Sequence, residues 1–178
     1  NGGRLHLKRA ESLLVQVSVQ SLGLDRASNT PVVILQEYGG ERVLPIWIGP
    51  GEASAIAMEL ADMKFSRPLT HDLLASVVGG LGGALQKVII SRVEESTYFA
   101  EMIIRRNGEV ISVDARPSDS IAVALRLEAG IFADEALLER TPLEGPEELT
   151  MGEPPVLEGE PDTELAAEEL KEYLRKLA

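Results

Sequence analysis

The stretch VIISRVEESTYFAEMIIRRNGEVISVDA, residues 88–115, decides the fold. It holds three runs rich in β-branched and aromatic residues, which predict strands; these runs are residues 88–93, 98–105 and 110–114. Asn107-Gly108 separates the last two runs and is the strongest short-range hairpin signal in the chain. The stretch therefore predicts an antiparallel arrangement.

The sequence RPSDSIAVAL follows at once, as residues 116–125. Ser118 is a suitable N-cap for a helix through Ala129, and Gly130 is suited to end it. The apolar run from Ile121 to Leu125 has no break, so this helix is expected to be covered on most sides.

Upstream of this stretch, residues 13–20 alternate between apolar and polar, which predicts a half-buried strand. Two more strands are expected over 32–35 and 43–48. Pro45 cannot donate a ladder hydrogen bond, so the strand over 43–48 is expected at a sheet edge or at a bulge.

Three further helices are expected from apolar spacing, over 52–63, from Thr70 to Gly79, and over 133–140. The first has small residues on one side, including Ala53 and Ala57. The second has Thr70 as a candidate N-cap and a predicted buried face; this face comprises Leu73, Leu74, Val77 and Val78.

Together these elements predict an α+β fold, with a mixed, largely antiparallel sheet of about six strands and three or four packed helices. Four regions follow in order: a loose N-terminal arm over 1–11, the folded domain over 12–140, an acidic, proline-rich linker over 141–161, and an amphipathic C-terminal helix over 162–178.

Composition excludes several kinds of site. The chain has no cysteine and two histidines, so it has no disulfide framework, thiol nucleophile or multi-histidine metal cage. No apolar run is long enough to cross a bilayer, and no signal peptide is evident, so we expect no membrane partner and a cytoplasmic protein. The net charge is −12, and a polyanion would bind only at a local basic cluster.

Three motifs carry the functional signal: Leu44-Pro45-Ile46-Trp47-Ile48-Gly49 followed by Glu52-Ala53, Arg67-Pro68-Leu69-Thr70-His71-Asp72-Leu73-Leu74, and Asp114-Ala115-Arg116-Pro117-Ser118-Asp119-Ser120-Ile121-Ala122. In this order and spacing they resemble the bifunctional nuclease family of small bacterial and plant domains, and the resemblance covers residues 13–140. It implies a phosphodiesterase that cleaves DNA and RNA.

The residues are adequate for that chemistry. Asp114 and Asp119 are candidate catalytic groups and, with Glu52, candidate ligands for Mg²⁺ or Mn²⁺, which prefer oxygen ligands. Arg116 lies between the two aspartates and is suited to bind two phosphate oxygens. Ser118 and Arg67 are further candidates for substrate binding.

His71 is the candidate general acid or base, since it is the only histidine inside the predicted domain. Each role has a structural alternative: His71 bonds a carbonyl, Ser118 and Asp119 cap a helix, and Arg116 pairs with Asp114. For Trp47, packing in the core or against another subunit is preferred to base stacking.

Two functions are consistent with these residues. The first is a nuclease that hydrolyses phosphodiester bonds of DNA and RNA with little sequence preference, assisted by a divalent cation. The alternative is a non-catalytic homodimeric module that binds an anion or another protein, with the alanine-faced helix from Glu52 packed across the two-fold axis.

Overall fold

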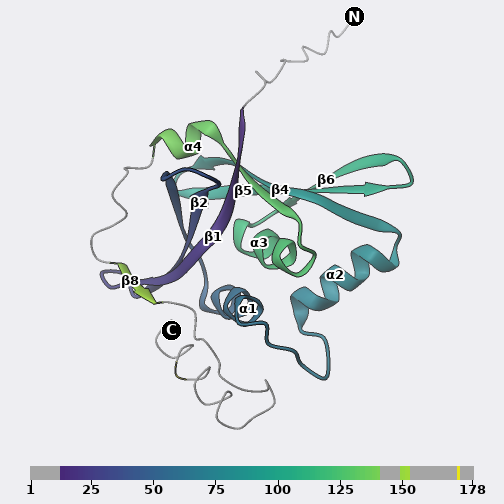
Figure 1. Ribbon diagram of the computed structural model, residues 1–178, viewed down its shortest axis with the longest axis horizontal. Coiled ribbons are helices and arrows are strands. Elements are labelled where there is room, and N and C mark those ends of the chain that lie inside the picture. The colour runs from purple at the N-terminus through teal and green to yellow at the C-terminus, as the bar shows by residue number, and fades with distance from the viewer. Residues whose placement is uncertain (1–12, 141–148, 153–171, 173–178) are drawn as a thin grey trace, which may run out of the picture.

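The computed structural model describes residues 13–140, 149–152 and 172. Within them one curved mixed sheet packs against helices (Figure 1). The strands are β1 (Leu14–Asp25), β2 (Thr30–Glu37), β3 (Val43–Trp47), β4 (Gly83–Glu94), β5 (Thr97–Arg106), β6 (Glu109–Ala115), β7 (Gly130–Asp134) and β8 (Leu149–Gly152). The helices are α1 (Pro50–Leu60), α2 (Thr70–Gly80), α3 (Pro117–Arg126) and α4 (Glu135–Arg140).

The strand order β3-β2-β1-β7-β4-β5-β6 confirms a mixed, largely antiparallel sheet. Every pairing along it is antiparallel except β4 with β7, and β8 adds to β1 outside this order. The β5–β6 hairpin turns at Asn107-Gly108 as expected, and both residues have positive φ. Pro45 lies on β3, which is an edge strand, as its missing donor predicts.

Helix α3 lies at the centre of the molecule and contacts α1, α2 and three strands (Figure 1). Its residues from Ser120 to Ala124 are fully buried, which confirms a helix covered on most sides. Strands β4, β5 and β6 extend together past the rest of the sheet, and α2 leads into β4 (Figure 1). This arrangement places the first turns of α1, α2 and α3 near one another.

Three predictions about helix boundaries were wrong. The helix expected over 133–140 begins only at Glu135, because Gly130–Asp134 forms β7 between β1 and β4. Ser118 is not an N-cap: Arg116 takes that position in extended backbone, and Pro117 occupies the first turn, where its missing N–H costs nothing. Thr70 likewise lies inside α2, whose N-cap is Leu69.

The buried face predicted for α2 was wrong, and the structure also shows where the small residues of α1 and the side chain of Trp47 lie. Leu73, Leu74 and Val77 of α2 are 54%, 40% and 45% exposed, and we call these three residues the apolar face. The small residues of α1 instead pack inside the chain's own core, so they offer no surface for a two-fold axis; Ala53, Ala55 and Ala57 are all buried. Trp47 is 44% exposed, so it does not pack in the core, and its packing against another subunit stays a prediction.

The terminal predictions fall largely outside the described residues. These are the N-terminal arm over 1–11, most of the linker over 141–161 and, except for residue 172, the C-terminal helix over 162–178. Four residues of the expected linker form β8, which pairs with residues Leu22–Asp25 of β1. None of the helices in the described ranges combines the length and apolar character that crossing a bilayer requires.

Candidate active site

The first turns of three helices supply a cluster of charged side chains. His71 comes from α2, Glu52 from α1, and Arg116 and Asp119 from the start of α3. The free N–H donors and the dipole at a helix N-terminus attract anions, which suits the two carboxylates of this cluster. The central packing of α3 against α1 and α2 brings the three helices into range.

Asp119 is at the centre of this cluster. Its Oδ1 lies 3.0 Å from Nε2 of His71, and its Oδ2 accepts a 2.7 Å hydrogen bond from Nε of Arg116. Burial by itself would raise the pKa of Asp119, but the bonds from Arg116 and His71 outweigh it and hold that pKa below 3.8. Asp119 is therefore an ionised acceptor near neutral pH.

The carboxylate fixes which tautomer of His71 the site holds. An ionised carboxylate can only accept, so Nε2 of His71 carries the hydrogen and donates it. In the neutral imidazole Nδ1 then carries the lone pair, and within the described residues it has no hydrogen-bond partner. This pairing excludes the alternative in which His71 binds a backbone carbonyl through Nε2.

Arg116 bridges two carboxylates and still faces solvent. One Nη of its guanidinium lies 2.6 Å from Oε1 of Glu52, and its Nε bonds Asp119. The Asp119 bond, with the charge of Glu52 beside it, raises the pKa of Arg116. The Arg116 side chain remains 66% exposed, so donors of the planar fork stay available to a phosphate. The alternative in which Arg116 pairs with Asp114 is not seen, because Arg116 bonds Glu52 and Asp119 instead.

A groove of about 750 Å³ opens beside this cluster. His71, Asp114, Arg116 and Asp119 all line it, so the structure brings together four of the residues that the sequence singled out. The rest of the lining is mostly apolar: Leu74, Val78, Phe99, Met102, Ile104 and Val113. The volume of the groove leaves room for more than a single phosphate group, and its lining combines charged with apolar side chains.

The other predicted residues lie elsewhere or act indirectly. Ser118 is buried and lines a second pocket, on the other side of Arg116. Arg67 is exposed in the loop between α1 and α2 and lines neither pocket. Glu52 reaches the cluster only through Arg116.

The residues expected to bind a metal do not form a three-ligand site. Within the described residues no three His, Asp or Glu side chains are grouped to hold an ion. Asp119 and Glu52 are both bonded to Arg116. Asp114 is exposed, lines the groove and has no partner in the described part of the chain. It fits the way Mg²⁺ commonly binds, through one or two carboxylates together with substrate phosphates and water.

A second ion cluster, absent from the sequence analysis, fixes the position of His71. Arg126 is only 6% exposed, and its Nε bonds Oδ1 of Asp72, the residue after His71. The same guanidinium donates to the carbonyls of Ala122 and Ala55, and so joins all three helices. The signal in the sequence is Asp72, an acidic residue within the second motif and next to His71.

Comparison with known proteins agrees with the resemblance seen in the motifs. The family model of the bifunctional nuclease domain matches residues 33–145. Two uncharacterized proteins of Mycobacterium tuberculosis are each 44% identical over 133 residues, which are 75% of this chain and 79% of theirs. Bifunctional nuclease 1 of Oryza sativa is 26% identical over 60% of this chain and 33% of its own length. Bifunctional nuclease 1 of Arabidopsis thaliana is 25% identical over 64% of this chain and 36% of its own length.

Proposed function

The chain belongs to the bifunctional nuclease domain family, and on that premise we propose that it hydrolyses phosphodiester bonds of DNA and RNA at the groove beside His71 and Asp119. The observation that carries the proposal is the His71–Asp119–Arg116 constellation, because it combines a base, its orienting carboxylate and a phosphate-binding cation. The chain spans about a third of the length of the plant nucleases it matches.

In this proposal His71 acts as the general base. Its Nδ1 takes a proton from water, and the oxygen of that water attacks phosphorus while the bond to the leaving oxygen breaks. Asp119 accepts from Nε2–H throughout, which keeps the tautomer correct and stabilises the imidazolium that forms. The leaving oxygen takes its proton from solvent.

In this proposal Arg116 stabilises the negative charge of the phosphate in the transition state. Its exposed donors bind the non-bridging phosphate oxygens, whose charge grows in the transition state. Because Asp119 holds the Nε edge, the guanidinium is oriented before substrate arrives. A divalent cation bound at Asp114 together with the phosphate would withdraw further charge from phosphorus.

The test uses the purified full chain with end-labelled single-stranded DNA and RNA, in Mg²⁺, in Mn²⁺ and in chelator. We expect His71→Ala, Asp119→Asn and Arg116→Met each to lower kcat/KM by about 100-fold or more. The control is Asp62→Asn, which removes an exposed carboxylate that pairs only with Lys64 on the surface. Activity unchanged in the three variants would overturn the proposal.

The cation is tested by Asp114→Ala. If Asp114 holds the ion, this variant loses the stimulation by Mg²⁺ or Mn²⁺ and falls to the rate that the wild type shows in chelator. A variant that keeps the full stimulation rejects Asp114 as ligand.

The cytoplasmic location expected from the sequence remains a prediction, which cell fractionation checks.

A non-catalytic homodimeric module that binds an anion or another protein is the second candidate, and the apolar face favours it. Leu74 lines the same groove as Val113 of the edge strand β6, and Leu73, Val77 and Val110 are exposed as well. A second copy pairing there would cover apolar surface on both chains. Light scattering should then give twice the monomer mass for the wild type and the monomer mass for Leu73→Glu. Dimerisation without cleavage of any strand would select this candidate over the nuclease.

A further inference from the structure

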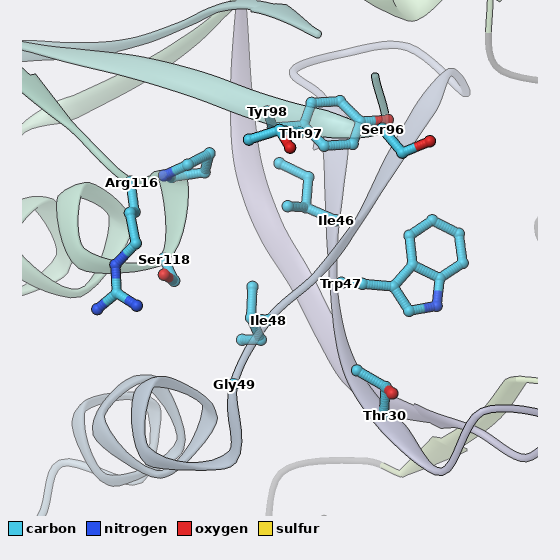
Figure 2. Close-up of a pocket in the computed structure, with 11 residues that line it drawn as sticks. Thr30, Ile46, Trp47, Ile48, Gly49, Ser96, Thr97, Tyr98, Arg116 and Ser118 are labelled. Carbon is cyan, nitrogen blue, oxygen red and sulfur yellow. The ribbon is translucent and has the colours of Figure 1, made fainter. Parts of the chain in front are cut away.

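A second pocket, of about 330 Å³, lies on the far side of Arg116 from the groove. Four parts of the chain line it: Thr30 on β2, residues 46–49, the turn and start of β5 at Ser96–Tyr98, and the start of α3 at residues 116–118. In Figure 2, Arg116 and Ser118 stand on one side and Trp47 on the other, with Ile46 and Ile48 between them. Its volume suits a small, flat group.

Trp47 is the feature of this pocket that needs explaining. It is 44% exposed although Ile46 and Ile48 on either side are buried. Its indole Nε1 donates a 2.8 Å hydrogen bond to Asp25, which also closes the β1–β2 turn by accepting from Ala27 and Ser28. The turn thus holds an exposed, oriented indole, and an indole face is a platform on which any base can stack.

Tyr98 adds a polar handle to the same pocket. Its ring is half-buried and lies above the isoleucines in Figure 2, close to Ser96 and Thr97. Burial raises the pKa of Tyr98, so its hydroxyl keeps its proton. That hydroxyl has no hydrogen-bond partner within the described residues, although the pocket is open to a ligand. Base edges carry the donors and acceptors that a free hydroxyl can meet.

Arg116 connects this pocket to the site of cleavage. It lines both the pocket and the groove that holds His71 and Asp119. A strand whose phosphate lies on Arg116 would therefore place a neighbouring nucleotide at the pocket. The lining combines apolar side chains, such as Ile46 and Ile48, with polar ones, such as Ser96 and Thr97. These two kinds of group match the face and the edge of a nucleobase.

We propose that this pocket binds an unpaired nucleobase of a single-stranded substrate, with the base stacked on Trp47 and its edge facing Tyr98, next to the phosphate held by Arg116. The substrate class rests on the proposed nuclease function. A base inside a duplex cannot reach such a pocket without unstacking, so the pocket selects single strands over duplexes.

The sole tryptophan makes the test direct, because all tryptophan emission reports on this pocket. The full chain is titrated in chelator with an oligothymidylate and with a strand of equal length and charge that lacks bases. We expect the oligothymidylate to change Trp47 emission and to bind about tenfold more tightly than the abasic strand. Equal affinity for the two strands, or no change in emission, would overturn the proposal.

Variants separate stacking from folding. Trp47→Ala should weaken binding of a labelled oligothymidylate about tenfold, while Trp47→Phe, which keeps a ring but loses the bond to Asp25, should retain most of the affinity. The matched control is Phe65→Ala, because Phe65 is also 44% exposed but lies in the loop between α1 and α2. Affinity that is equal in Trp47→Ala and wild type contradicts the proposal.

The two proposals fail in different ways. A chain that cleaves strands but binds abasic and base-bearing ones alike keeps the nuclease function and loses the base pocket. A chain that stacks bases on Trp47 but cleaves nothing under any metal condition keeps the base pocket and loses the nuclease function.

Discussion

Helix α3 carries one arginine at each end, and the two arginines lie in opposite environments: Arg126 bonds groups of α1, α2 and α3, whereas Arg116 bonds side chains of α1 and α3. Arg126 is 6% exposed and bonds Asp72 and two backbone carbonyls. Arg116 is 66% exposed and binds Asp119 and Glu52. His71 and Asp72 are adjacent, yet each contacts a different cluster. The comparison teaches that burial, more than partner type, separates an ion pair that holds helices together from one that can receive a ligand.

The largest expected difference between the two ends is in stability. Arg126→Met leaves Asp72 without its partner in a partly buried position and should cost about 3 kcal/mol of unfolding free energy. Arg116→Met removes an exposed pair and should cost less than about 1 kcal/mol. Urea unfolding of both variants beside wild type measures the two losses. Equal losses would break the distinction between a structural and a functional arginine.

The next largest effect is the loss of stability in Asp72→Asn, and it depends on pH. Burial alone would raise the pKa of Asp72, but the N–H of Leu69 and the guanidinium of Arg126 hold it below the ordinary value of 3.8. A carboxyl with a lowered folded pKa stabilises the fold above its unfolded pKa, and this contribution is lost as pH falls through the folded value. Asp72→Asn should therefore be about 1.5 kcal/mol less stable than wild type near neutral pH.

That gap should close as the pH falls below about 4, because a protonated Asp72 resembles asparagine. The measurement is urea unfolding of both proteins over the acid range, with Asp62→Asn as the exposed control. A gap that stays constant with pH would mean that the charge of Asp72 contributes nothing to the fold.

The smallest effect is expected at Glu52, which competes with phosphate for Arg116. Glu52→Gln keeps the shape but removes one negative charge, so KM for an oligonucleotide should fall about threefold while kcat stays unchanged. Steady-state kinetics at low salt measure both constants. A fall in kcat instead would assign Glu52 to the chemical step and not to substrate binding.

Local sequence patterns predicted the turn between β5 and β6 and the edge position of β3. The β5–β6 turn depends only on Asn107-Gly108, and the edge position of β3 on Pro45, so neighbouring residues suffice to predict them. Strand β7 was missed because Gly130–Asp134 is short and Ala133 onward also fits helical spacing. The apolar spacing of α2 predicted a buried face, but spacing shows which residues share a side and not whether anything packs against it.

For the candidate site, the motifs likewise predicted the residues but not all of their contacts. The motifs identified His71, Asp114, Arg116 and Asp119, which meet at one groove. They did not show that Arg116 bonds Glu52 and Asp119 and leaves Asp114 free, because that choice depends on how α1 packs against α3. Nor did they show the exposure of Trp47, since alternation along β3 does not reveal that one of its sides faces an open pocket.

The most direct test of the central claim is chemical rescue of His71→Ala. His71 lines a groove of about 750 Å³, so free imidazole can enter the space that its ring leaves. If His71 is the base that Asp119 orients, imidazole should raise the cleavage rate of His71→Ala in proportion to its concentration and should leave Arg116→Met unchanged. A His71→Ala variant that is folded but gains nothing from imidazole, or that cleaves at the wild-type rate without it, would contradict the account.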